Sequence, residues 1–108
     1  MRKMRKFHIK FEPIADDEDI DIKLLGSRSK LGGKPDWEQQ DETPNCPSCK
    51  HLMVFIGQID SIAHDEEHNP TRVNAIFGNS DYMFGDVGMI YIFFCFDCLE
   101  TKSIFQCS

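Results

Sequence analysis

The chain has 108 residues, 41% of them hydrophobic, and a formal net charge of −6 at pH 7. This hydrophobic content excludes an intrinsically disordered chain, and the length predicts a single domain over residues 1–108. No apolar run approaches membrane-spanning length, so we expect no membrane protein. A chain of this length buries only a small hydrophobic core, so a structural metal would add substantially to the stability of the domain.

The N-terminus is basic, whereas the rest of the chain is acidic. The first ten residues hold no acid and five bases, namely Arg2, Lys3, Arg5, Lys6 and Lys10. Residues 11–108 therefore carry −11. The alternation of Phe7, Ile9 and Phe11 predicts a β-strand over residues 5–11 rather than the apolar segment of a signal peptide. We expect a cytoplasmic protein whose basic start is a solubilising tail or edge strand, with contact to an anionic partner as the alternative.

The next segment is acidic and leads into a glycine-containing loop. Residues 15–21 lack the glycine and the final glutamate of a calcium loop, so we expect a solvated loop, with weak cation binding as the alternative. A turn follows over residues 26–30. Residues 31–37, Leu-Gly-Gly-Lys-Pro-Asp-Trp, predict a structured turn, because its two glycines allow positive φ and its proline fixes a bend. Trp37 should anchor this turn on the core. Binding of a ligand backbone or phosphate at Gly32-Gly33 is the alternative.

The second half of the chain predicts β-strands. They cover residues 52–59, 73–77, 89–96 and 101–106, separated by turns at 78–81 and 85–88. The first should be buried on both faces and the third should be central, because both are continuously apolar. Gln58 interrupts the first strand, so its amide needs a buried partner, and we expect it to tie the Gly32-Gly33 loop to the sheet. No helical stripe occurs, so we expect a mostly β fold (β or α+β) built on a small antiparallel sheet.

Two Cys-x-x-Cys pairs, Cys46/Cys49 and Cys95/Cys98, are separated by 45 residues. Four thiols in two tight pairs predict a zinc-ribbon-like tetrahedral site. The strand after the first pair leads away from the metal and the strand before the second pair leads back, so the two strands should be antiparallel with the metal at one end. Four thiolates close the coordination shell, which indicates structural zinc and no catalytic residue. Two pairs of buried or redox-active thiols are the alternative.

Some residues near these motifs have competing interpretations. Lys50 and Leu99 follow the two pairs where glycine is common, and Leu99 predicts a distorted second knuckle. We interpret Cys107 as a terminal bystander, with replacement of a ligand as the alternative. His64-Asp65-Glu66-Glu67-His68 is similar to the H-E-x-x-H of zinc proteases, but it has Asp at the glutamate position and Asn69-Pro70 soon after it. We therefore expect an exposed acidic loop there.

The ordered motifs carry a resemblance to known families. They are Gly32-Gly33-x-Pro35-x-Trp37, Cys46-x-x-Cys49, Phe55-x-x-Gln58 and Cys95-x-x-Cys98. In this order they resemble the bacterial YwqG-like family and, more distantly, the eukaryotic programmed cell death protein 2 group. The first resemblance implies no established catalytic residue, and the second implies a chaperone-like role toward a ribosomal protein.

These features favour a non-enzymatic zinc-binding domain that acts in protein–protein interaction, as a chaperone-like or toxin-neutralising partner. An acidic chain suits a basic protein partner and argues against nucleic acid. The alternative is a small-molecule-binding or hydrolytic enzyme that uses the Gly32–Trp37 loop and the His64–His68 segment. A further alternative is nucleic-acid binding through the basic N-terminus.

Overall fold

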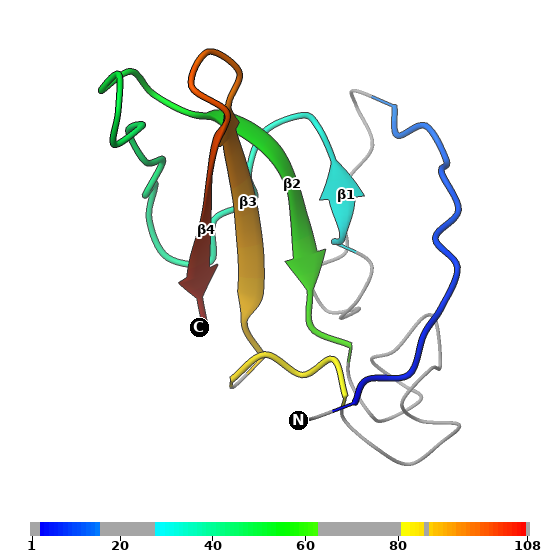
Figure 1. Cartoon of the computed structure of the whole chain (residues 1–108). Helices are drawn as coiled ribbons and strands as arrows, with labels where there is room; N and C mark the ends of the chain where they lie inside the picture. Colours follow the sequence, from blue (N-terminus) through cyan, green and yellow to red (C-terminus); the bar gives the residue numbers. More distant parts are fainter. Residues whose placement is uncertain (1–2, 16–27, 63–80, 86, 108) are drawn as a thin grey trace.

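A computed structural model describes residues 3–15, 28–62, 81–85 and 87–107. In these ranges the chain forms one antiparallel sheet in the order β1-β2-β3-β4 and no helix (Figure 1). The strands are β1 (Lys30–Leu31), β2 (Val54–Asp60), β3 (Met89–Cys95) and β4 (Glu100–Gln106). The predicted antiparallel β fold is thus confirmed. The predicted strand over residues 73–77 lies outside the described residues, and the described part contains no helix long and apolar enough to cross a membrane.

The strand register gives the sheet two distinct ends. β2 and β3 pair from Val54↔Phe94 at one end to Asp60↔Met89 at the other, with a register shift between Phe55 and Gly57. β3 and β4 pair from Cys95↔Glu100 to Met89↔Gln106. The predicted outgoing and returning strands are therefore antiparallel, and the second cysteine pair lies where β3 turns into β4.

One face of the sheet, the inner face, packs against the loop that follows β1. Met89, Tyr91 and Phe93 on this face are completely buried. The Trp37 ring lies 4.5 Å from the Tyr91 ring and 5.9 Å from the Phe93 ring, measured between centroids. In Figure 1 the loop passes behind the strands. The predicted role of Trp37 as the anchor of this loop is confirmed.

The opposite face, the outer face, is apolar and more open. Alternation along the strands places on it Val54, Ile59, Ile90, Ile92, Phe94 and Phe105. Val54 is 50% exposed and Ile59 is 41% exposed. The prediction that the strand over 52–59 is buried on both faces is wrong, because the loop after β1 covers the inner face and leaves Val54 and Ile59 exposed on the outer face.

The loop after β1 has the conformation that its glycines predict. Gly32 and Gly33 have φ values of 75° and 73°, in the left-handed region that glycine enters without steric cost. The Gln58 amide nitrogen donates to the Arg28 carbonyl oxygen (2.7 Å), and the Gln58 amide oxygen accepts from the Asp36 N–H (2.9 Å). Gln58 therefore ties this loop to the sheet, as predicted, although its partners flank the two glycines.

Two predictions about the N-terminal half are wrong. The turn predicted over residues 26–30 does not extend to Lys30, which forms β1 with Leu31 because the chain pairs with β2 before it reaches the glycines. Residues 5–11 form no strand. Their described contacts are made by Arg5 and Phe7 to Asp81 and Tyr82, largely through side chains rather than a backbone ladder. Alternation alone could not produce a strand without a sheet edge to pair with.

Candidate metal centre

The first cysteine pair lies in a tight loop that leads into β2. The Cys46 N–H donates to the His51 carbonyl oxygen (2.8 Å), and the Lys50 N–H donates to the Cys46 carbonyl oxygen (2.9 Å). Lys50 has a φ of 69°, which lets the chain turn back immediately after Cys49. These bonds close the first knuckle so that both thiols face the same side of the loop.

The second pair is held in the same way at the end of β3. The Leu99 N–H donates to the Cys95 carbonyl oxygen (2.8 Å), and Leu99 has a φ of 59°. Both knuckles therefore use a left-handed residue directly after their second cysteine. The predicted distortion of the second knuckle is wrong, because leucine adopts the conformation that glycine favours; left-handed backbone costs roughly 1–2 kcal/mol for a residue with a side chain.

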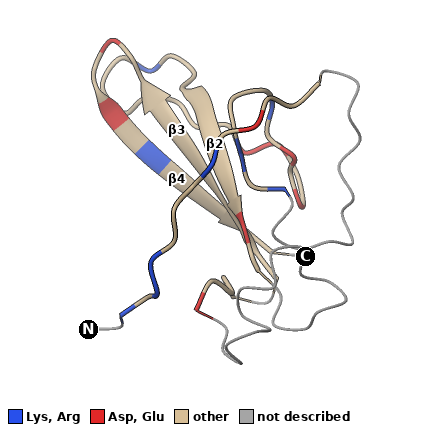
Figure 2. Ribbon diagram, turned by 90° about the vertical axis from the view of Figure 1, so that its right-hand side faces the viewer, with Lys and Arg blue, Asp and Glu red and all other residues tan. Residues whose placement is uncertain are grey.

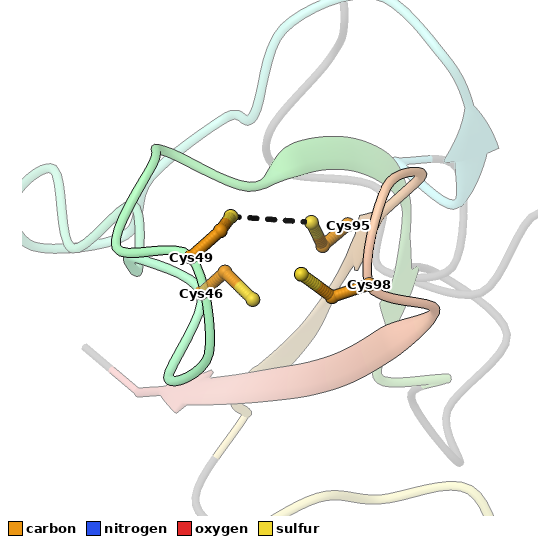
Figure 3. Close-up of side chains that lie close together, drawn as sticks. All are labelled: Cys46, Cys49, Cys95 and Cys98. Atoms are coloured by element: carbon orange, nitrogen blue, oxygen red, sulfur yellow. Dashed lines mark hydrogen bonds between the residues drawn. The ribbon is translucent and has the colours of Figure 1, made fainter.

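The two knuckles bring four sulfur atoms together. The ligand atoms of Cys46, Cys49, Cys95 and Cys98 all lie within 4.8 Å of one another, and the Cys49 and Cys95 sulfurs are 3.7 Å apart. Figure 3 shows the four side chains pointing toward a common centre. A tetrahedral site with Zn–S bonds of about 2.3 Å has its sulfurs about 3.8 Å apart. The cluster thus needs little contraction to fit such an ion.

The thiols of the cluster differ in acidity. The backbone N–H groups of Cys49 and Ser48 lower the pKa of Cys46 to about 7, against the effect of burial. Hydrogen bonding to Cys49, together with burial, raises the pKa of Cys98 to about 12. The metal-free cluster therefore holds protons at neutral pH. A metal that binds four thiolates must displace them, so its affinity should rise with pH.

The donor set suits a structural site for a soft or borderline metal ion. Thiolates favour zinc, copper(I) and iron–sulfur chemistry over calcium or magnesium. Four ligands from the protein complete a tetrahedral shell and leave no position for a reactive water. Cys46 and Cys95 are buried in the hydrophobic core, with Cys49 and Cys98 packed against it. A bound ion would therefore join the first knuckle to the turn between β3 and β4.

The other candidate residues lie apart from this cluster. Cys107 follows β4 at the end of the sheet opposite Cys95, so the structure does not bring it to the other four cysteines. The segment His64–His68 and the acidic residues 16–21 lie outside the described residues. Gly32, Gly33 and Trp37 lie within the described residues, in the loop that hydrogen-bonds to the sheet through Gln58.

Sequence reasoning missed a buried ionic group at the far end of the sheet. Arg28 binds both carboxylate oxygens of Asp60, through Nε (3.0 Å) and a terminal nitrogen (2.8 Å). Arg28 also pairs with Glu38. Arg28 is 6% exposed and Asp60 1% exposed. The charge of Asp60 at the end of an apolar strand was the available signal, because a buried carboxylate needs a partner.

Comparison with known proteins adds one relative. The chain is 31% identical over 86 residues to an uncharacterized protein, YpfL, of Salmonella typhimurium. This match covers 80% of the chain but only 16% of YpfL, so the chain spans about a sixth of that protein's length. No family model and no solved structure matches the chain.

Proposed function

We propose that the Cys46, Cys49, Cys95 and Cys98 cluster holds a structural zinc ion, and that the chain is a non-enzymatic domain that binds another protein. The closed four-sulfur geometry is the observation that carries this proposal. Zinc prefers a tetrahedral sulfur shell, and a shell filled by protein ligands suits a structural rather than a catalytic ion.

The polar groups of the Gly32–Trp37 loop support a structural role for the loop. Asp36 pairs with Lys30 (2.9 Å), and its N–H donates to Gln58. The Tyr91 hydroxyl donates to the Asp36 carbonyl oxygen (2.7 Å) and accepts from the Glu38 N–H (2.9 Å). These groups bond within the chain, which argues against a catalytic role for this loop.

The charge distribution supports a basic partner. The described residues hold nine acidic and nine basic side chains, so the net charge of −6 comes from residues outside the described ranges. Residues 16–19 alone contribute four acids. A basic protein, as in the chaperone-like or toxin-neutralising role, would associate faster with such a chain at low salt. We propose that this interaction takes place in the cytoplasm. We also propose that the chain is related to the YwqG-like family and, more distantly, to the programmed cell death protein 2 family.

Metal analysis of the purified chain tests the first part of the proposal. We expect one zinc per chain in the wild type and in Cys107→Ser, and a large loss in Cys95→Ser. A full zinc content in Cys95→Ser, or none in the wild type, would contradict the zinc assignment.

Cross-linking and affinity capture from the native cell extract test the second part. A variant with residues 16–19 neutralised (Asp16→Asn, Asp17→Asn, Glu18→Gln and Asp19→Asn) should keep its zinc and lose most of a basic partner. The same partner recovered equally by both proteins would contradict recognition through charge. Turnover of a small molecule without any specific partner would overturn the non-enzymatic role.

A further inference from the structure

The outer face of the sheet differs from the rest of the described surface because it carries no charge. The apolar residues on this face are Val54, Ile59, Ile90, Ile92, Phe94 and Phe105. Leu31 of β1 extends the face, since Leu31 pairs with Gly57, which in turn pairs with Ile92. Its polar members on β4 are Thr101 and Ser103, which pair with Phe94 and Ile92 and are neutral. On the long strands the charged residues are Asp60, Glu100 and Lys102, and Figure 2 colours the charged positions along the ribbon. The strand register places all three on the inner face.

Most of this face is open in the described structure, and the turn that holds Gly85 and Gly88 lies against the Phe105 ring at one end of it. Leu31 is 65% exposed, Val54 50% and Phe105 51%. The Phe96 ring, 64% exposed, continues the surface beyond β3 through an edge-on contact with Phe94 at 4.9 Å between centroids. In Figure 1 the strands β2 to β4 face the viewer, and no described segment crosses in front of their length.

The size of the surface is of the order that a stable dimer requires. A large side chain has roughly 150–250 Å² of surface, so the exposed fractions on this face amount to several hundred Å² per copy. A standard protein interface buries about 800 Å² per partner. Monomeric proteins rarely leave an apolar patch of this size open without a function.

We propose that a second copy of this chain covers the outer face, so that two sheets pack face to face about a two-fold axis. Sheets stack about 10 Å apart with interdigitated side chains, and this face offers the aliphatic and aromatic side chains that such a layer uses. A two-fold axis brings the same patch together from both copies and closes the assembly at a dimer.

Charge favours a second copy over the other occupants. Two chains with a net charge of −6 repel one another, but a neutral face brings no like charges into contact at the interface. A basic protein or a nucleic acid would find no acidic or basic partner on this face. The dimer does not rest on the proposed client or on the zinc ion, because it uses the side of the sheet that faces away from Trp37.

Sedimentation velocity of the full chain over about a hundredfold range of concentration tests the dimer. We expect the wild type to shift reversibly from monomer to dimer. Val54→Lys and Ser103→Lys should each weaken dimerisation at least about tenfold, because each brings a charge into the apolar interface and desolvates it. Ile9→Lys is the matched control, since Ile9 is 81% exposed and belongs to none of the four strands, and it should dimerise like the wild type.

Two results would overturn the proposal. One is a wild type that stays monomeric at every concentration, and the other is a dimer that Val54→Lys and Ser103→Lys leave intact. Ser103 is already exposed and polar, so Ser103→Lys keeps the test valid if Val54→Lys does not fold. Zinc content and partner capture, measured on the same proteins, keep a failure of the dimer distinguishable from a failure of the proposed function.

Discussion

The two ends of this sheet are held together by different chemistry. At the Cys95 end, two knuckles meet through four sulfur atoms. At the Asp60 end, the loop and strand ends meet through a buried ion pair and side-chain hydrogen bonds. Gln106 shows the second pattern, since its amide oxygen accepts from the Gln39 N–H (3.0 Å) and its nitrogen donates to the Gln40 carbonyl oxygen (2.7 Å).

The contrast shows which end depends on a ligand. At the far end, the buried side chains of Arg28, Asp60 and Gln106 bond to groups of the same chain. The sulfur end gathers four thiols that make only weak hydrogen bonds among themselves, and it gains most of its strength when a metal replaces their protons. We therefore expect that removal of a metal ligand destabilises the first knuckle more than any other described part of the chain.

Loss of a metal ligand should have the largest effect. Zinc binding contributes roughly 10 kcal/mol in zinc-finger peptides, and a whole domain is stable by only about 5–15 kcal/mol. We expect Cys95→Ser to lose cooperative thermal unfolding, measured by circular dichroism. Cys107→Ser should unfold like the wild type, because Cys107 lies at the other end of the sheet. Equal melting curves for the two variants would show that the sulfur end does not depend on the cluster.

Breaking the buried ion pair should come next. Asp60→Asn leaves the Arg28 guanidinium buried with reduced compensation, and loss of one partner of such a pair costs about 3–5 kcal/mol. We expect this loss in urea denaturation, with zinc content unchanged. The triple variant Arg28→Met/Glu38→Gln/Asp60→Leu should recover much of the stability, because it leaves none of the three charges unpaired. A cost below about 1 kcal/mol for Asp60→Asn would mean that the far end is held by other contacts.

A methyl group between β1 and β2 should have a smaller effect. A Cβ atom on Gly57 would lie 2.6 Å from the Lys30 carbonyl oxygen, so Gly57→Ala must push β1 away at a cost of about 1–3 kcal/mol. Gly32→Ala is the control, since open space surrounds Gly32 and only its positive φ is strained. The backbone N–H of residue 32 bonds to the Ile56 carbonyl oxygen. Its hydrogen-exchange protection, corrected for the intrinsic rate of the residue at that position, should fall more in Gly57→Ala than in Gly32→Ala. The reverse order would contradict the close strand contact.

The smallest effect should be a pH dependence at high pH. Burial is the main cause that raises the pKa of Tyr91 to about 12, against about 10 in an unfolded chain. A raised pKa means that this contribution to stability is fully present below pH 10 and is lost as the pH rises toward 12. In a Tyr82→Phe background, an ultraviolet titration follows Tyr91 alone. Ionisation near pH 10 in the folded protein would contradict its burial under Trp37.

The sequence predicted the parts of the fold that local patterns determine. The continuous apolar run at 89–96 predicted β3, and the spacing of the cysteine pairs predicted which sulfurs meet. Trp37 was predictable as an anchor, because a large aromatic side chain next to a glycine-containing turn is expected to bury its ring on the core. Each of these inferences depended on chemistry within a short segment.

The remaining features depended on distant partners. Residues 5–11 alternate like a strand, but only a sheet edge could make them one. β1 is two residues long and exists because Gly57 lets the chain approach closely. Arg28 and Asp60 are 32 positions apart, so no local pattern could reveal that they pair. The open outer face also went unpredicted, because an apolar run does not show which of its faces is covered.

X-ray absorption at the zinc K-edge of the purified, metal-loaded chain most directly tests the central claim that four sulfurs hold a structural zinc ion. We predict a single shell of four sulfur atoms at about 2.3 Å and no oxygen or nitrogen neighbour. A first shell that contains oxygen or nitrogen, or a chain that retains no zinc after purification, would contradict the account.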